Sequence, residues 1–438
     1  MSPCLEDCPN EIIETIVVLL DLDDIRSLRQ SCRSLAAKTT QNHFKSYYHS
    51  KRVDITLPAL RAFVDVTQPG RLGCLVQELI LVGLTNGAEG QNSKPQYGPA
   101  ETELDLLSQA FNGIAANRKS GQHLSLSLKV AVVQDDAKQR LLPADVARGG
   151  WKFVWQSAAQ TFHTTLRALA ASRLPLEKLD VFNDRQSQSC SIACDELGRV
   201  DFQDKGLAIS LSSLKSLSIS LSDKIIEELP PPNFSQPPKE KDIREAKKKA
   251  TARSNFVGLV KLLQLTRLLD SLEIHYYRLD TAGHLLRPFS AHHERLLKQV
   301  AGSENLPKLK QCRLRGIYIS DGDLLAFIQR TATRRLFIEK VDVSSGTFRS
   351  IFDYCTRETT GIEELYFDYL IEKGNLLYFP PPDQVGHTQV PRRSTTSLQR
   401  VGAKVKQPII YHYHQGRTED TPRTRALQLQ RRREYGPL

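Results

Sequence analysis

The sequence lacks any uncharged apolar run long enough to cross a membrane. Its longest apolar stretch, residues 12–22, is interrupted by Glu14 and Asp21, whereas a membrane-spanning helix needs about 18 such residues. The residues before this stretch are acidic, which is not the pattern of a secretory signal peptide. We therefore expect a soluble protein, without membrane contact, in the cytoplasm, the nucleus or both.

Cysteine pairs at metal-binding spacing are also lacking. The eight cysteines are scattered, mostly among apolar neighbours, as is typical of small buried residues in a reducing compartment. Cys190 and Cys194 are not followed by a second pair or by histidines at zinc-finger spacing. His292-His293 and the histidines of residues 411–414 are read as surface residues, because adjacent side chains on a helix point in different directions. We expect free thiols, no metal site and no cofactor.

The usual traces of catalysis are missing as well. The sequence contains no GxSxG elbow, no P-loop, no HExxH and no GxGxxG pattern that opens a helix. This chain is therefore not expected to be an enzyme.

What the sequence does contain is enough apolar residues for a large core. The 438 residues are 40% apolar and 25% charged, so they predict either a few domains or one elongated repetitive domain. The net charge is +11. Residues 390–438 contain eleven basic and three acidic residues and so contribute a net +8. With little apolar periodicity, residues 381–438 are predicted to be a disordered basic tail.

Residues 9–35 have the apolar spacing of consecutive short helices. Ile12, Ile13, Ile16, Val17, Leu19 and Leu20 recur every three or four residues. Pro9 suits the first turn of a helix. Asp23 is expected to cap a second helix, whose apolar stripe is Ile25, Leu28, Cys32 and Leu35.

The order of these residues, Cys8-Pro9-Asn10-Glu11-Ile12-Ile13 followed by Asp23-Asp24-Ile25 and Ser31-Cys32-Arg33, resembles the F-box. The chain departs from the family pattern at Cys8, where leucine is usual, and at Leu35, where tryptophan is common. The resemblance implies a helical domain over residues 1–48 that binds a Skp-family adaptor and, through it, a cullin-RING core. It places the adaptor contacts at Pro9, Ile12, Ile13, Ile16, Leu19, Leu20, Ile25, Leu28 and Cys32.

Beyond residue 48, short strands with a Leu-x-x-Leu-x-Leu pattern alternate with amphipathic helices. The strand patterns are Val76/Leu79/Leu81, Leu176/Leu179/Val181, Leu214/Leu217/Ile219, Leu269/Leu272/Ile274, Leu309/Cys312/Leu314, Ile338/Val341/Val343 and Ile362/Leu365/Phe367, with a further strand at residues 123–133. The last spacings, from Cys312 to Val341 and from Val341 to Leu365, are 29 and 24 residues, within the range of leucine-rich repeats. Residues 49–380 therefore resemble a degenerate leucine-rich-repeat solenoid, with a flexible Pro- and Lys-rich insertion at 229–255.

The expected fold class is α+β, with a helical F-box followed by an α/β solenoid of parallel strands. The expected function is that of a substrate receptor of an SCF-type ubiquitin ligase, similar to F-box proteins common in filamentous fungi, with an unknown protein substrate. In this pattern the residues between the leucines point to solvent, so substrate is expected on Ile80, Asp180, Ser218, Glu273, Asp342, Phe182 and Asp368 and above all on His275, Arg313, Arg315 and Tyr366. The two arginines are expected to clamp an acidic or phosphorylated segment.

Two other functions fit the same sequence. One is a repeat scaffold outside the ubiquitin system. The other is a nuclear protein whose tail neutralises phosphates of nucleic acid, but few aromatics for base stacking accompany those basic residues, so nucleic-acid binding is not the expected function.

Overall fold

The computed structural model describes residues 4–85, 101–118, 124–133, 140–141, 151–183, 190–222, 252–277, 290–381 and 394–413, with five further positions between 241 and 249. Most of the insertion predicted at 229–255 and the whole tail after residue 413 lie outside these ranges. Within the described part, no helix is both long and apolar enough to cross a membrane.

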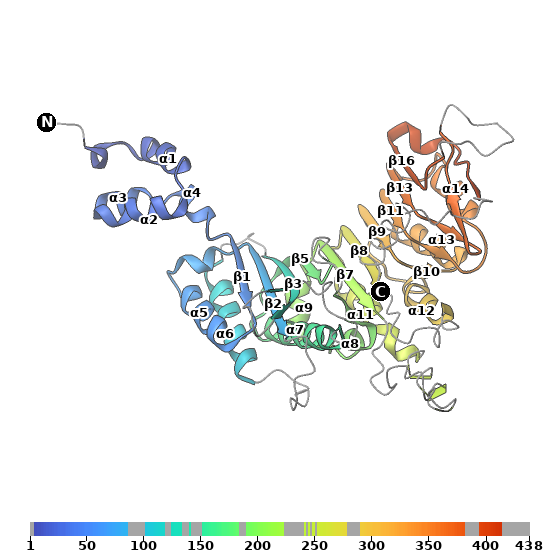
Figure 1. The fold of residues 1–438 in the computed structure, drawn as a ribbon, viewed down its shortest axis with the longest axis horizontal. Helices are drawn as coiled ribbons and strands as arrows, with labels where there is room; N and C mark the ends of the chain where they lie inside the picture. Colours follow the sequence, from blue (N-terminus) through green and yellow to red (C-terminus); the bar gives the residue numbers. More distant parts are fainter. Residues whose placement is uncertain are drawn as a thin grey trace.

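The first helices form a small module with a core of its own. After a 3-10 turn at Leu5–Asp7 come α1 (Asn10–Val18), α2 (Leu22–Ser31), α3 (Arg33–Lys38) and α4 (Asn42–Ser46). Their inward side chains make one apolar cluster, separate from the main core, that contains Ile13, Val17, Ile25, Leu35 and Phe44. Figure 1 shows this module standing out from one end of the sheet. We call it the N-terminal module.

The predicted second helix is in fact two helices. Asp21, and not Asp23, caps α2, because its Oδ1 accepts hydrogen bonds from Asp23 N at 3.0 Å and Asp24 N at 2.8 Å. Cys32 then adopts an extended conformation, and its sulfur accepts from Leu35 N at the start of α3. The break lets Ile25 and Leu35 face the same core from different helices.

The rest of the described chain is built on one large sheet. Nine strands run parallel, in chain order, and a tenth closes the sheet as an antiparallel edge. They are β1 (Ser50–Asp54), β2 (Glu78–Thr85), β3 (Leu124–Val133), β5 (Leu176–Val181), β7 (Ser216–Ser222), β8 (Ser271–Tyr277), β9 (Gln311–Arg315), β11 (Arg335–Glu339), β13 (Glu364–Asp368) and β16 (Ser397–Val401). Two short strands, β4 (Arg140–Leu141) and β6 (Ile192–Ala193), attach to β3 and β7.

Helices connect the parallel strands and cover one face of the sheet (Figure 1). They are α5 (Leu57–Thr67), α6 (Glu101–Ala116), α7 (Trp151–Ser172), α8 (Cys194–Gly198), α9 (Lys205–Leu211), α11 (Val257–Leu265), α12 (Ser290–Ala301), α13 (Asp321–Thr331) and α14 (Arg349–Cys355). The alternation confirms the predicted α+β class at the level of a mixed fold with a mostly parallel sheet.

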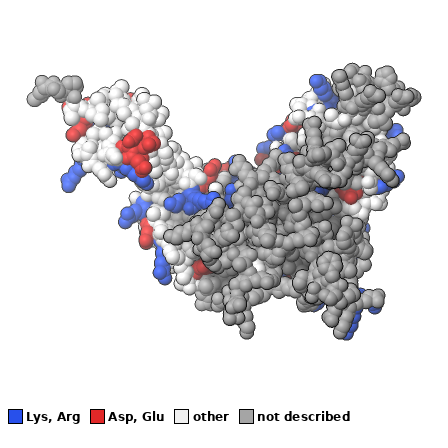
Figure 2. Space-filling view, viewed as in Figure 1, with Lys and Arg blue, Asp and Glu red and all other residues white. Residues whose placement is uncertain are grey.

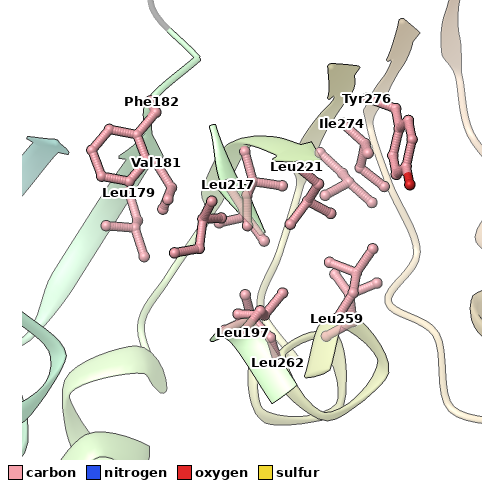
Figure 3. Packing of buried hydrophobic residues seen from close by; sticks show 14 of the residues in the cluster. Leu179, Val181, Phe182, Leu197, Leu217, Leu221, Leu259, Leu262, Ile274 and Tyr276 are labelled. Atoms are coloured by element: carbon pink, nitrogen blue, oxygen red, sulfur yellow. The ribbon is translucent and has the colours of Figure 1, made fainter. Parts of the chain in front are cut away.

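The sheet and these helices share one continuous core. In Figure 3, side chains of β5, β7 and β8 meet Leu197 of α8 and Leu259 and Leu262 of α11. The strand leucines of the pattern face this side: Leu217 and Leu272 are 1% exposed. Burying a leucine contributes about 1.5–3 kcal/mol, so the alternating leucines fix which face of each strand points inward.

A local repeat recurs at the carboxyl ends of the last strands. The residues that follow β9, β11 and β13 are Gly316, Lys340 and Tyr369, and all three have positive φ, at +69°, +49° and +54°. These turns, 24 and 29 residues apart, lead into the short strands β10 (Tyr318–Ile319), β12 (Asp342–Val343) and β14 (Ile371–Glu372) of a second sheet. That sheet ends with β15 (Asn375–Tyr378) and β17 (His412–Tyr413).

The structure corrects the predicted register of one strand. The prediction centred a strand on Val341, whereas β11 pairs Leu336 with Cys312 and Leu365. Because the chain turns at Lys340, Asp342 belongs to β12 and lies outside the large sheet. The outward residues of this strand are therefore Arg335, Phe337 and Glu339.

The predicted disorder of residues 381–438 is wrong for residues 394–413. β16 pairs with β13, and the following 3-10 helix, Gly402–Lys406, buries Val405 completely. Tyr411 then packs on Phe352, with ring centroids 5.4 Å apart, before β17 pairs with β15. Leu398, Val405, Ile409 and Tyr411 of this segment contact the main core, whereas Val401, Ile410 and Tyr413 are exposed.

Candidate protein-interaction surfaces

The N-terminal module carries an apolar stripe on the outside of α1. Ile12, Ile16 and Leu19 follow one another at spacings of four and three residues and so share one side of the helix. Ile12 is 51% exposed, Ile16 is half-buried and Leu19 is 83% exposed. Five of the eleven large apolar side chains that are exposed in the described part of the chain lie within residues 5–47. Such a concentration of exposed apolar area is typical of a protein-binding site.

Not every residue predicted to contact an adaptor is available for it. Ile13 and Ile25 are 0% exposed and form the module core, so their assignment as adaptor contacts is corrected. Leu20, Leu28 and Cys32 are half-buried against the same core. The helical period explains the division, since residues 13 and 17 point inward where residues 12, 16 and 19 point outward. Pro9, at the N-cap of α1, is exposed.

Polar contacts between its helices hold the module in shape. The Arg29 guanidinium stacks on the Phe44 ring, 4.2 Å from its centroid, and donates to Ala36 O at 2.9 Å. Glu14 Oε1 accepts from His43 N at 2.9 Å, and Lys38 Nζ donates to Cys8 O at 2.8 Å. The outer stripe therefore rests on a scaffold with internal contacts of its own.

A second surface lies on the sheet face opposite the helices. Cross-strand pairing places its side chains in two rows over β7, β8, β9, β11, β13 and β16, which we call the ladder face. One row is Ser218, Glu273, Arg313, Phe337, Tyr366 and Gln399, and the other is Ser220, His275, Arg315, Glu339, Asp368 and Ser397. In Figure 2 the outline of the molecule is hollowed between the N-terminal module and the opposite end.

Charges on the ladder face are paired across the strands. Arg315 Nη1 lies 3.3 Å from Glu273 Oε1, and its Nε lies 3.8 Å from Glu339 Oε2. Arg313 Nε lies 3.8 Å from Glu273 Oε2, and its Nη1 contacts Glu339 Oε1. Two arginines and two glutamates thus pair with one another across β8, β9 and β11.

The structure brings together the predicted substrate residues but changes their environment. His275 and Arg315 are neighbours in register, yet each is only 3% exposed, so the expectation that they point to solvent is wrong. The Nδ1 of His275 lies 3.1 Å from Ser220 Oγ. Arg313 and Tyr366 are half-buried. Since both arginines already face glutamates, the face holds no ready-made pair of unpaired arginines for a phosphate.

Sequence reasoning missed two members of this surface, Phe337 and Glu339. Phe337 lies under the Arg313 guanidinium, at 4.4 Å from ring centroid to Cζ, and beside Tyr366, at 6.3 Å between ring centroids. The signal for both was the pattern Leu336-Phe337-Ile338-Glu339, which alternates inward and outward residues in the same way as Cys312-Arg313-Leu314-Arg315. The prediction missed both residues because it centred this strand on Val341, whereas Leu336 occupies that place in β11.

The chain's thiols and histidines do not form a reactive centre in the described part of the structure. All eight cysteines are free. Burial raises the pKa of the Cys355 thiol to about 12 and also raises that of Cys190, so neither is a thiolate at neutral pH. In the described ranges no three His, Cys, Asp or Glu side chains are grouped as metal ligands. His412 stacks on Tyr378, with centroids 6.3 Å apart, while the side chains of His292, His293 and His414 lie outside the description.

The sequence matches no protein-family model, and no curated protein is significantly similar to it. The geometry of the N-terminal module and of the ladder face is therefore the basis on which a function is proposed.

Proposed function

We propose that this chain is a non-catalytic substrate receptor of an SCF-type cullin-RING ubiquitin ligase. In this proposal the N-terminal module is an F-box that binds a Skp-family adaptor. The sheet and its helices are a leucine-rich-repeat-like solenoid that binds the substrate protein. Cytoplasmic or nuclear residence follows from this role.

The observation that carries the proposal is the division of the apolar residues of α1. One set, Ile13 and Val17, closes the core of the module, against which Leu72 of the sheet domain also packs. The other set, Ile12, Ile16 and Leu19, faces outward without serving that core. A helix that served only its own domain would need just the first set, because exposed apolar side chains gain nothing from water.

The repeated turns after β9, β11 and β13 support the second half of the proposal. Their intervals of 24 and 29 residues fall within the range of leucine-rich repeats. Each unit adds one parallel strand and one helix, which gives an extended face suited to a protein partner.

A receptor of this kind needs no catalytic residue. Holding a substrate lysine near the thioester of a conjugating enzyme raises its effective concentration, and the chemistry belongs to other subunits.

Co-purification tests the proposal. The full chain and a chain that starts at residue 49 are each mixed with a purified Skp-family adaptor. The chain is then captured, and the adaptor recovered with it is quantified. The proposal expects recovery with the full chain only. A full chain that folds and recovers no adaptor would instead support a repeat scaffold outside the ubiquitin system.

A further inference from the structure

The arginines of the ladder face all pair with glutamates in the described part of the chain. Arg313 and Arg315 share Glu273 and Glu339, as described above. Arg335, at the edge of the same face, pairs with Glu364 on β13, with 2.7 Å between Nε and Oε2. A phosphate that entered here would have to displace a glutamate from each arginine and would lie beside the displaced carboxylates. Repulsion of this kind is how an interface rejects a charged competitor.

The surface that remains for contact at this end is aromatic, amide and aliphatic. Tyr366 is half-buried beside the mostly buried Phe337, and its partner across the strands is Gln399, which is exposed. Val401, at the end of β16, is 57% exposed. Tyrosine beside a rigid neighbour loses little entropy on binding, and aromatic residues dominate the energy of protein interfaces.

We infer that the ladder face recognises an unphosphorylated segment of the substrate, anchored by an aromatic or aliphatic side chain against Tyr366 and Phe337. The arginines act as internal supports that hold neighbouring strands in register, and they do not clamp the ligand. This inference rests on the proposed receptor function and names the class of segment that the receptor takes.

Selection from a random peptide library displayed on bacteriophage tests whether the ladder face binds unphosphorylated segments, because such peptides carry no phosphate. The full chain is immobilised, and enriched peptides are resynthesised and titrated against wild type, Tyr366→Ala and the control Tyr318→Ala. Tyr318 lies on β10 in the second sheet, away from the ladder face. We expect anchored peptides that bind Tyr366→Ala about tenfold or more weakly and the control unchanged. Peptides that tolerate Tyr366→Ala, or no enrichment at all, would overturn the inference.

Titration with a phosphoserine peptide, and with its serine counterpart, tests whether the arginines of the ladder face bind phosphate. Wild type should not discriminate between the two peptides at physiological salt. The variant Glu273→Gln/Glu339→Gln removes both carboxylates that pair with the half-buried Arg313, so it should bind the phosphopeptide at least about tenfold more tightly than wild type does. Selective binding by wild type, or no gain in a variant shown to be folded by its circular dichroism, would contradict the inference. Adaptor binding is measured on the same samples, so failure of the receptor proposal is seen separately.

Discussion

Arg315 on β9 and Glu273 on β8 form an ion pair, with 3.3 Å between Nη1 and Oε1, although only 4% of the arginine side chain is exposed. A buried charge is expensive unless it is paired. The network of Arg313, Arg315, Glu273 and Glu339 therefore ties three neighbouring strands together.

The first prediction concerns this network. Glu273→Ala should lower the free energy of unfolding by about 3–5 kcal/mol, because it removes one of the two carboxylates that pair with Arg313 and the buried Arg315. The control is Glu177→Ala, which breaks the exposed pair with Lys215 and should cost less than about 1 kcal/mol. Urea unfolding followed by circular dichroism gives both values. Equal costs would show that the network is not a buried support.

A second prediction concerns Tyr413, at the end of the folded segment 394–413. Glu372 is 0% exposed, and its carboxylate accepts from Phe348 N at 2.8 Å and Tyr413 Oη at 2.5 Å. This hydrogen bond, with a contribution from burial, raises the pKa of Tyr413 above its usual value, so the neutral, donating form persists at every pH below the usual pKa of a tyrosine, about 10.

Tyr413→Phe removes this donor and should cost about 1–3 kcal/mol. The effect should be local, with faster amide hydrogen exchange in residues 397–413. Tyr47→Phe is the control, because it removes an exposed hydrogen bond to Leu20 O, at 3.2 Å, in the N-terminal module. Unchanged exchange in the Tyr413 variant would mean that this contact does not hold the segment.

A third prediction is a dependence on pH. Burial alone would raise the pKa of Glu196, but the hydrogen bond with His163, at 2.9 Å, and the charge of Arg199 together bring it below its usual value. A lowered folded-state pKa stabilises the fold at pH values above the unfolded value of 4.5, and this stabilisation is lost as the pH falls below that value.

Glu196→Gln should therefore be less stable than wild type at pH 7, by about 1–3 kcal/mol, and the difference should shrink below about pH 4.5. Thermal unfolding of both proteins across this range measures it. The exposed Glu363, whose partner Arg334 is 3.8 Å away, gives the control variant Glu363→Gln. A difference that stays constant with pH would assign the effect to packing.

The sequence was sufficient to place most strands, because burial of alternating leucines is a strong local signal. Leu217, Leu272 and Cys312 were predicted as inward residues and are buried in register with one another. It was not sufficient around Val341, where the inward residues of β11 and β12 follow each other across a turn. Only pairing between strands decides which of them belongs to the large sheet.

Exposure was the least predictable property of the site. Arg315 and His275 occupy outward positions of their strands, and the pattern alone says that such positions meet solvent. Both are buried. Arg315 lies between Glu273 and Glu339, and His275 lies beside Ser220, all on strands that are distant in sequence. The folded segment 394–413 was missed because its inward residues follow no regular apolar period, and Tyr411 packs on Phe352, which is distant in sequence.

The measurement that tests the receptor proposal most directly is the affinity of a purified Skp-family adaptor for Leu19→Asp, by isothermal titration calorimetry. Leu19 is 83% exposed, so this variant should fold as wild type does, whereas Leu20 also supports the module core. The control Leu268→Asp places the same charge at a 60% exposed leucine of the sheet domain. We predict at least about thirtyfold weaker binding for Leu19→Asp, equivalent to about 2 kcal/mol, and no change for the control. Equal affinity of wild type and folded Leu19→Asp would contradict the assignment of the N-terminal module as an F-box.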